Sequence, residues 1–322
     1  MVKSRNTPIR DWQGVVARAQ EISRRRMRLV VVAAAEDAAV LQAVCDAREK
    51  RIADAVLIGD RDRLRKMADS LNLDLADFSI RPAPDAASAA ALAADIAAAK
   101  EADVIMKGFL PTSTLLKAVL LKERGLRRSE VISHCAVMSF PAYPRLLNIT
   151  DGGMVVAPDI KQKIRIIENA VTVSRALGIE TPRIALLAAT DQVDLSMPHT
   201  CENAIIAKMG ERGRFGDAVV DGPLTFDAAT VPAVCRLRGI AGPVAGRADV
   251  LVVNSFDEGN LCGKALILFG DAVFCGVIVG AAVPVSLVSR TDPPRNKLAS
   301  VSMAVVLSDY LSEENEYVES HL

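Results

Sequence analysis

The sequence has few aromatic residues and no excess of charge of either sign. Aromatic side chains make up 4% of its 322 residues, so a core must be built from alanine, valine, leucine and isoleucine. Lysine plus arginine and aspartate plus glutamate number 39 each. Because there is no basic excess, the chain lacks the electrostatic footprint of a polynucleotide-binding protein. We therefore expect no nucleic-acid partner, and any bound anion must be held by a few placed groups.

Cysteine and histidine are also sparse and scattered. The six cysteines show no C-x-x-C spacing, and the three histidines lie far apart in the sequence. Neither a structural zinc site nor a disulfide framework fits such a pattern, and no H-E-x-x-H motif is present. We expect no bound metal, and we interpret the cysteines as buried free thiols in a reducing cytoplasm.

Long uninterrupted hydrophobic runs are missing as well. The first twenty residues carry charges but no apolar stretch of the signal-peptide kind. The longest uncharged stretch, residues 272–289, is interrupted by Gly276, Gly280 and Pro284 and is rich in β-branched residues. This pattern predicts buried strands instead of a membrane span. We expect a soluble cytoplasmic protein without a membrane partner.

Apolar runs, which indicate strands, alternate with amphipathic patterns, which indicate helices. This alternation favours an α/β fold with parallel βαβ units, doubly wound in the first half, and the length allows two domains. The predicted strands are 28–35, 53–59, 102–108, 130–140, 145–150, 183–190, 217–224, 248–253, 272–281 and 283–289. The predicted helices are 37–51, 60–71, 85–100, 160–177, 198–210, 227–237, 258–268 and 296–311. The strands 130–140 and 145–150 follow each other closely enough for a hairpin.

The stretch "ADVIMKGFLPTSTLLKAVL" is the first candidate site. A predicted strand ends in Lys107 and Gly108, and a helical pattern with Thr112 and Thr114 follows. Backbone N–H groups, hydroxyls and an ammonium at a strand-to-helix junction suit an anion. The spacing is that of neither a P-loop nor G-x-G-x-x-G. The alternative is a surface lysine next to a helix that Thr112 or Thr114 caps.

Two later strand ends repeat this pattern. In "NSFDEGNLCGKAL", Gly259 and Asn260 begin a predicted helix after an apolar strand, and Lys264 follows one turn later. In "VVDGPLTFDAA", Asp227 stands near the start of another helix, where an ordinary N-cap is the favoured interpretation. Open α/β sheets place ligands at the carboxyl ends of their strands, so both stretches are candidates.

The stretch "VSLVSRTDPPRNK" ends a buried strand in Ser289 and Arg290, with Asp292 close behind. A planar, permanently charged guanidinium at such a place suits a phosphoryl or carboxyl group. The alternative is a surface salt bridge between Arg290 and Asp292. We interpret His134, which stands alone in a strand-like run, as structural.

Together these stretches resemble the phosphate acetyl/butyryl transferase family, and most of all its phosphate butyryltransferase branch. The resemblance extends over almost the whole chain and includes "LLNITDGG", "APDIKQKIRIIENAV", "VVDGPLTFDAA" and "VPVSLVSRTD" in that order. It implies direct acyl transfer, acyl-CoA + phosphate ⇌ acyl phosphate + CoA, with a short acyl group. CoA is then a substrate, and no tightly bound cofactor is required.

The resemblance also implies the architecture. It predicts two doubly wound α/β/α domains with a cleft between them, as in isocitrate and isopropylmalate dehydrogenases, and a homodimer. The first domain would comprise residues 1–140 plus 291–322, and the inserted second domain would comprise residues 141–290.

The family's site residues carry over to the positions that match its motifs. The resemblance puts Ser289 and Arg290 at the reacting centre, with the guanidinium on the phosphoryl group and acyl oxygen. Lys107 and Gly108 with Thr112 and Thr114 would then hold phosphate or acyl phosphate. Substrate binding is completed by Gly259, Asn260 and Lys264.

The chain departs from the family at several positions. Asn296 stands where the acetyltransferase branch has a proposed catalytic aspartate, and Asp292 is the nearest replacement base. Asn254 and Gly263 stand where a proline and an aromatic residue are usual, and Asp191 stands where a glutamate is frequent. These changes leave two alternatives open. One is a binding protein for acyl-CoA or acyl phosphate with weakened catalysis, and the other is a dehydrogenase of the same architecture.

Overall fold

The computed structural model of this chain describes residues 7–287 and 292–319, which form an α/β fold of two compact units. We name the units by their place in the sequence. The terminal unit comprises Trp12–Glu130 and Val273–Leu322, and the middle unit comprises Met1–Asp11 and Val131–Ala272.

These unit boundaries differ by about ten to twenty residues from the domain boundaries that the sequence suggested. Strands β10 (Val273–Val279) and β11 (Val285–Ser286) group with the terminal unit, whereas the sequence placed them in the inserted domain. The assignment of residues 1–140 plus 291–322 and of residues 141–290 to two domains stays a prediction.

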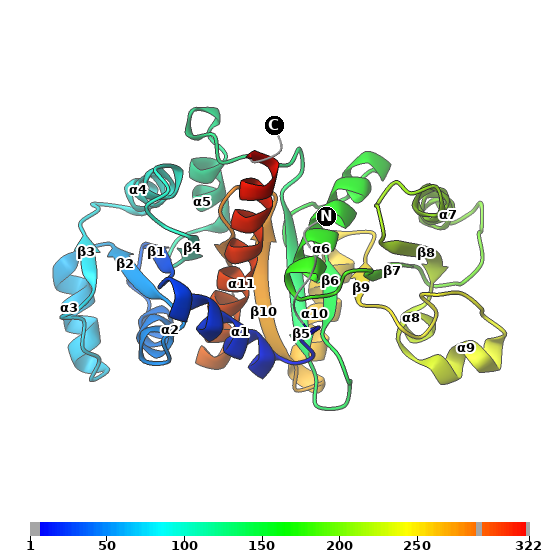
Figure 1. The fold of residues 1–322 in the computed structure, drawn as a ribbon, viewed down its shortest axis with the longest axis horizontal. Coiled ribbons are helices and arrows are strands. Elements are labelled where there is room, and N and C mark those ends of the chain that lie inside the picture. Colours follow the sequence, from blue (N-terminus) through cyan, green and yellow to red (C-terminus); the bar gives the residue numbers. More distant parts are fainter. Residues whose placement is uncertain (1–6, 288–291, 320–322) are drawn as a thin grey trace. The chain divides into compact units, whose positions relative to one another are not determined.

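The terminal unit is built on parallel strands in the order β3-β2-β1-β4-β11, followed by the antiparallel strand β10. Its first strands are β1 (Leu29–Ala33), β2 (Asp54–Ile58), β3 (Ser79–Arg81) and β4 (Val104–Lys107). Its helices are α1 (Trp12–Arg25), α2 (Ala38–Glu49), α3 (Arg61–Ser70), α4 (Ala86–Ala98), α5 (Thr112–Val119), the short η1 (Lys122–Arg124) and α11 (Pro294–Glu319). The strand order reverses direction at β1, with β2 on one side of it and β4 on the other (Figure 1).

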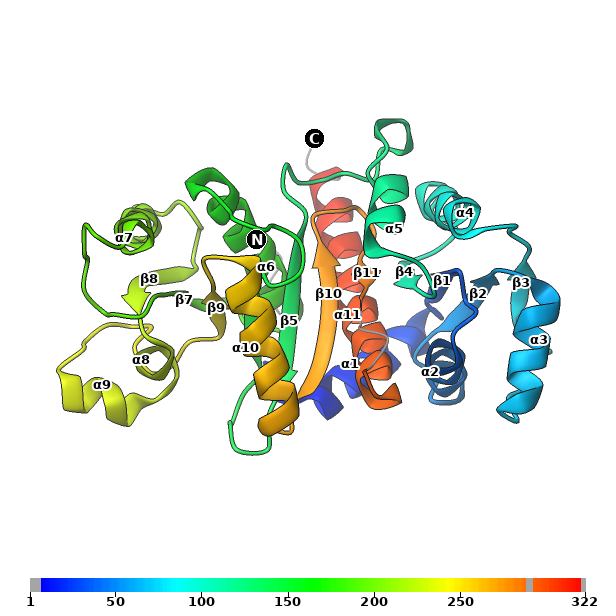
Figure 2. The ribbon, with the colours of Figure 1, turned by 180° about the vertical axis from the view of Figure 1, so that it is seen from behind.

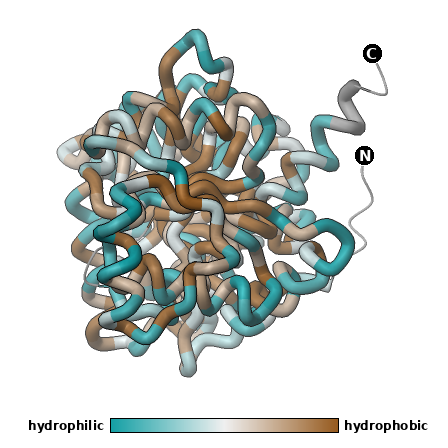
Figure 3. The backbone as a smooth tube through the Cα atoms, turned by 90° about the vertical axis from the view of Figure 1, so that its left-hand side faces the viewer, coloured by the Kyte–Doolittle hydropathy of each residue, from teal (hydrophilic) through white to brown (hydrophobic). Residues whose placement is uncertain are grey.

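The helices of the terminal unit cover its strands closely because the facing side chains are small. Five alanines of α4 are buried, so this helix lies near β1 and β4, with α5 beside it. Helices α2 and α11 pack together on the other side of the strands (Figures 1 and 2). Hydrophobic residues are concentrated in the interior strands, and hydrophilic ones in the outer helical turns (Figure 3). The buried residues are mostly alanine, valine, leucine and isoleucine, so the core is aliphatic, as the low aromatic content predicts.

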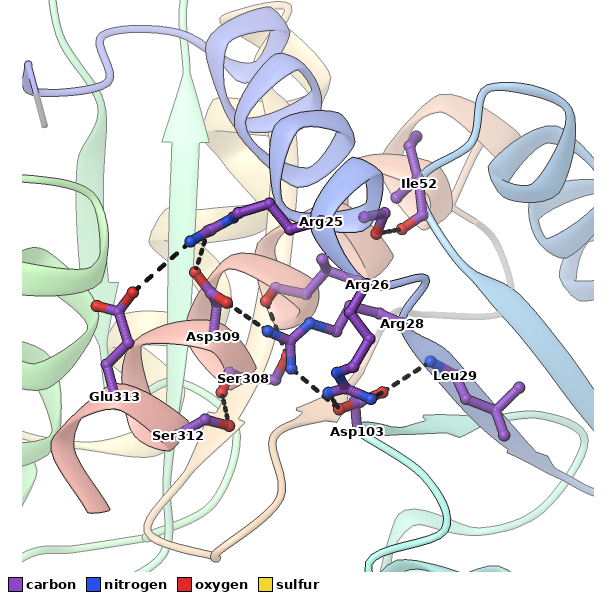
Figure 4. Close-up of polar contacts among 12 residues, drawn as sticks. Arg25, Arg26, Arg28, Leu29, Ile52, Asp103, Ser308, Asp309, Ser312 and Glu313 are labelled. Carbon is purple, nitrogen blue, oxygen red and sulfur yellow. Dashed lines mark hydrogen bonds and ion pairs between the residues drawn. The ribbon is translucent and has the colours of Figure 1, made fainter. Parts of the chain in front are cut away.

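A cluster of ion pairs ties α1, the start of β1, the start of β4 and α11 together (Figure 4). Asp103 accepts hydrogen bonds from Arg26, from Arg28 and from the N–H of Leu29. Burial alone would raise the pKa of Asp103, but these bonds hold it below its ordinary value. Asp309 of α11 pairs with Arg28 as well. The cluster lies at the amino ends of the strands, opposite the ends where the candidate site residues are found.

The middle unit has strand order β5-β6-β9-β7-β8, in which only β5 is antiparallel to its neighbour among the described strands. Its strands are β5 (Ser133–Ser139), β6 (Leu147–Thr150), β7 (Arg183–Leu187), β8 (Val219–Leu224) and β9 (Val250–Val252). Its helices are α6 (Ile160–Ala176), α7 (Pro198–Glu211), α8 (Phe226–Thr230), α9 (Pro232–Arg238) and α10 (Phe256–Phe269).

The predicted elements compare well with those observed. The hairpin is confirmed, because β5 and β6 pair antiparallel with Val137 opposite Asn148. The sequence interpretation did not include α1, although Val15, Ala19 and Ile22 form a buried stripe at helical spacing. Helix α10 begins two residues earlier than predicted because Ser255 caps it by accepting a hydrogen bond from the Glu258 N–H.

Candidate active site

The carboxyl end of β4 carries the first predicted site residues. The N–H of Gly108 donates to the Ala33 carbonyl at 2.9 Å, so the chain continues alongside the end of β1. A Cβ atom on Gly108 would lie 2.0 Å from the Ala34 carbonyl oxygen, which excludes any larger residue. Ala34 itself adopts a left-handed backbone (φ 55°), a conformation that costs roughly 1–2 kcal/mol. Such backbone outliers are concentrated at functional sites, so the conformation of Ala34 supports a functional role for this strand end.

Lys107 is the last residue of β4, and it is only 9% exposed. Its Nζ lies 3.4 Å from the Gly108 carbonyl oxygen. The alternative interpretation as a surface lysine is therefore wrong. An ammonium held inside the protein at the point where β1 and β4 diverge occupies the usual ligand position of an open α/β sheet.

Helix α5 begins directly after this strand end without a side-chain cap. Pro111 is its N-cap residue and makes no capping hydrogen bond. Thr112 and Thr114, both half-buried, stand at the first and third helical positions. The alternative in which either threonine caps the helix is therefore wrong. The first amide groups of α5 are available to water or to an anion.

In the middle unit, Gly259 and Asn260 lie in the first turn of α10. A Cβ on Gly259 would lie 2.5 Å from the Gly152 Cα, so the two glycines allow this turn to touch the loop after β6. Asn260 Nδ2 donates to the Gly152 carbonyl at 3.5 Å. The glycine is thus explained by backbone packing, and Lys264 is exposed one turn further along the helix.

The loop after β6 contains a buried carboxyl group that the sequence analysis did not single out. Asp151 is 2% exposed and accepts hydrogen bonds from the N–H groups of Gly153, Met154 and Val155 at 2.8, 2.9 and 3.1 Å. Burial raises the pKa of Asp151 to about 6 despite these bonds. The signal that could have found it is a strand followed by Asp-Gly-Gly, a pattern typical of a tight turn at a strand end.

His134 of β5 lies against this loop. A Cβ on Gly153 would come within 2.7 Å of the His134 ring. Burial lowers the pKa of His134 to about 4, so the imidazole is neutral at neutral pH. The interpretation of His134 as structural agrees with this burial.

A second missed feature is a polar cluster at the carboxyl ends of β7 and β9. Lys163 of α6 is 2% exposed, and its Nζ donates to Glu202 Oε2 at 2.8 Å and to Asn254 Oδ1 at 3.2 Å. Asn254 Nδ2 donates to the Leu187 carbonyl at 2.8 Å. Asn254, a departure from the family pattern, is therefore fully engaged. No local motif indicates these contacts, because the residues are far apart in the sequence.

The end of β8 differs from its favoured interpretation. Thr225, and not Asp227, is the N-cap residue of α8. Asp227 pairs with Arg238 at 2.8 Å, and Arg238 also contacts Asp191 at 3.3 Å. Asp191 thus belongs to an ion-pair cluster in the middle unit.

The predicted reacting residues Ser289 and Arg290 lie outside the described residues. Asp292, close behind them, is described and half-buried. Asn296 is completely buried in the first turn of α11, and its Oδ1 accepts from the Phe274 N–H at 3.4 Å. Its Nδ2 has no hydrogen-bond partner among the described residues. An amide here does not supply the proton acceptor that an aspartate would.

Gly263, another departure, is buried on the inner side of α10. A Cβ there would lie 3.3 Å from Met138 Cε, so an aromatic side chain would require Met138 to move. Within 7–287 and 292–319, no three histidine, cysteine or acidic residues are grouped closely enough to hold a metal ion. None of the helices in the same ranges is long and apolar enough to cross a membrane.

Comparison with known proteins gives the family. The model described as Phosphate acetyl/butaryl transferase matches residues 14–87 and 82–305. The chain is 38% identical over 288 residues to the phosphate butyryltransferase of Clostridium acetobutylicum, covering 89% of this chain and 96% of that protein. It is 34% identical over 288 residues to the phosphate acetyltransferase of Thermotoga maritima, covering 89% and 98%.

A solved structure agrees. The crystal structure of a branched-chain phosphotransacylase from Enterococcus faecalis V583 superimposes with a TM-score of 0.80 at 32% identity, covering 88% of this chain and 99% of that one. The chain belongs to the phosphate acetyl/butyryl transferase family. It is a phosphate acyltransferase, and the resemblance found in its sequence is confirmed.

Proposed function

We propose that this chain transfers a short acyl group, butyryl-sized in preference to acetyl, between coenzyme A and inorganic phosphate. The relatives named above act on butyryl, acetyl or branched-chain groups according to their names, and the butyryltransferase is more similar than the acetyltransferase. The single observation that carries the proposal is Lys107, a buried cation at the carboxyl end of β4 beside the uncapped start of α5.

In the proposed reaction a phosphate oxygen attacks the thioester carbonyl directly. The new C–O bond forms, the C–S bond breaks, and the CoA thiolate leaves and takes up a proton. Lys107 and the α5 amide groups would hold the phosphate dianion, with Gly108 allowing the close turn and Thr112 and Thr114 offering hydroxyls. Holding both substrates in the reacting geometry lowers the entropic part of the activation barrier, which is a large part of catalysis of a two-substrate reaction.

The oxyanion of the tetrahedral intermediate needs donors of its own. We assign this role to Arg290, with Ser289 donating to the carbonyl oxygen or the sulfur, on the strength of the family resemblance. Asp292 would accept the thiol proton when CoA attacks acyl phosphate to form acyl-CoA, and would return a proton to the leaving thiolate in the opposite direction. No metal and no tightly bound cofactor enters this scheme.

We assign coenzyme A to the first turns of α10 in the middle unit. Asn260 offers an amide, and the exposed Lys264 offers a charge for a CoA phosphate. Gly259 contributes through its lack of a side chain, which keeps the turn close to Gly152. We also expect both units to be doubly wound α/β/α domains. We expect the enzyme to be a homodimer, so light scattering should give twice the 34.3 kDa mass of one chain.

The test is CoA release from acetyl-, butyryl- and longer acyl-CoA, with and without phosphate, followed with a thiol reagent. Phosphate-dependent release, greatest for butyryl-CoA, is the expected result. CoA release that does not depend on phosphate would instead indicate a thioesterase and contradict the proposal. Arsenate in place of phosphate should support continuous release, because the acyl arsenate hydrolyses.

One observation favours a second candidate function, which is binding of CoA without catalysis. The buried amide of Asn296 stands where a proposed catalytic aspartate is found in the acetyltransferase branch. A protein that binds CoA but releases none from any acyl-CoA would be a binding protein with lost catalysis. In that case Asn296→Asp should restore turnover.

A further inference from the structure

We propose that Lys163 is a positioning residue, which fixes Asn254 and, through Asn254, the first turn of α10 in the geometry that CoA binding requires. The inference rests on the proposed function, which assigns that turn to CoA. Lys163 itself would touch neither CoA nor phosphate. It would act by holding the junction between β9 and α10.

The burial of Lys163 is the first observation. Its side chain is 2% exposed, yet it carries an ammonium group. Its Nζ bridges two elements, with Glu202 Oε2 of α7 at 2.8 Å and Asn254 Oδ1 at 3.2 Å. An apolar side chain at this place would avoid the loss of hydration that a buried charge suffers. The lysine is therefore better explained by the orientation that it imposes than by the stability that it adds.

Asn254 is the second observation, because it connects three elements. Its Nδ2 donates to the Leu187 carbonyl at the end of β7, and its Oδ1 accepts from Lys163 of α6. Its backbone N–H donates to Glu258 Oε2 of α10 at 2.9 Å. A proline, usual here in the family, has neither an N–H nor an amide side chain and can make none of these bonds.

The sparse packing of α10 is the third observation. Only Gly259 and Gly263 of this helix are buried, and neither has a side chain. The larger apolar side chains of the helix are half-buried or exposed, so the polar contacts at its first turn matter for its position. The bonds from Asn254, the Ser255 cap and the contacts with Gly152 together hold its first turn. A loss of the Lys163–Asn254 contact should therefore change the positions of Asn260 and Lys264.

The experiment measures kcat, the KM for butyryl-CoA, the KM for phosphate and the melting temperature of Lys163→Met. We expect the KM for butyryl-CoA to rise, by up to about 100-fold, because small displacements of positioning groups have effects of that order. The KM for phosphate should stay within about twofold of wild type. Asn254→Ala, which keeps Lys163, should show the same split.

Arg183→Met is the matched control. It also breaks an ion pair of the same unit, with Asp249, which is 4% exposed. This pair joins the amino ends of β7 and β9, the opposite edge from α10's first turn. We expect a lower melting temperature and unchanged KM values.

Each of three results would overturn the inference. One is a Lys163→Met variant that melts lower, as the control does, but keeps the KM for butyryl-CoA. If that variant does not fold, an unchanged KM for butyryl-CoA in Asn254→Ala is equally contrary. Additive effects of Lys163→Met and Asn254→Ala on that KM in the double variant would contradict action of Lys163 through Asn254. Failure of the proposed function is separate, because wild type itself would then show no phosphate-dependent release of CoA. Calorimetric CoA affinity would replace KM in the same comparisons.

Discussion

Lys107 is proposed to bind phosphate because its ammonium group is buried at the carboxyl end of β4. Its removal takes a charge-assisted hydrogen bond of roughly 1.5–3 kcal/mol from the proposed phosphate site. We predict that Lys107→Ala raises the KM for phosphate about 10- to 100-fold with little change in the KM for acyl-CoA. Steady-state kinetics with each substrate varied in turn would measure this. Lys117→Ala, which changes an exposed lysine of α5, is the control and should leave both constants unchanged. Equal behaviour of the two variants would exclude Lys107 from the site.

Arg290 is proposed to act in the transition state, so its loss should appear in kcat. We predict that Arg290→Ala loses about 10²–10³ in kcat, the typical effect of losing one oxyanion donor, while the protein stays folded. Stopped assays of CoA release and a melting curve would measure both properties.

Arg290→Lys keeps the charge but loses the planar fork, so it should recover only part of the rate. Full activity in Arg290→Ala would refute the assignment. A variant that is inactive because it is unfolded would leave Arg290 without the proposed role and make it a structural residue.

At the scale of elements, β5 and the loop after β6 hold two titrating groups with opposite shifts. The pKa of Asp151 is raised from 3.8 to about 6, and that of His134 is lowered from 6.5 to about 4. The Asp151 contribution to stability is present below pH 3.8 and is lost as pH rises through about 6. The His134 contribution is present above pH 6.5 and is lost as pH falls through about 4. The two therefore oppose each other over the same pH window.

We predict that His134→Asn exposes the Asp151 contribution. Between pH 4 and 6.5, the variant's stability should fall with rising pH relative to wild type. Urea unfolding midpoints at several pH values would measure it. His199→Asn, on α7, removes a histidine outside this contact and should follow the wild-type profile. A His134→Asn profile parallel to wild type would show that His134 does not titrate in this window.

At the scale of the whole molecule, the balanced charge means that ligand anions must be recognised locally. CoA binding to the folded chain should then stabilise it by mass action, by about 2.7 kcal/mol at a concentration of 100 times Kd. We predict that the melting temperature rises by several degrees with saturating CoA. Differential scanning fluorimetry with CoA, and with free pantetheine as the control lacking the phosphates, would measure the shift. No shift with CoA would contradict substrate binding.

Much of the fold is predictable because it depends on neighbours in the sequence. The alternation of apolar runs and amphipathic stretches predicts βαβ units, and a short polar connection predicts the β5–β6 hairpin. Helix ends are less predictable: α10 begins at Phe256 because Ser255 offers the capping oxygen, whereas the glycine pattern suggested a later start. Helix α1 was missed because its stripe is short and surrounded by charges.

Some features of the candidate site also follow from local sequence, and others depend on contacts between distant residues. The sequence by itself determined the α/β class and the family, and it proposed the strand ends as the place of the site residues, because spacing and local pattern carry that information. Only the tertiary structure decided that Lys107 is buried, that Gly259 packs on Gly152, and that Lys163 meets Glu202 and Asn254. The last two contacts join residues 39 and 91 positions apart. Such contacts arise when packing brings separate elements together, and no local pattern encodes them.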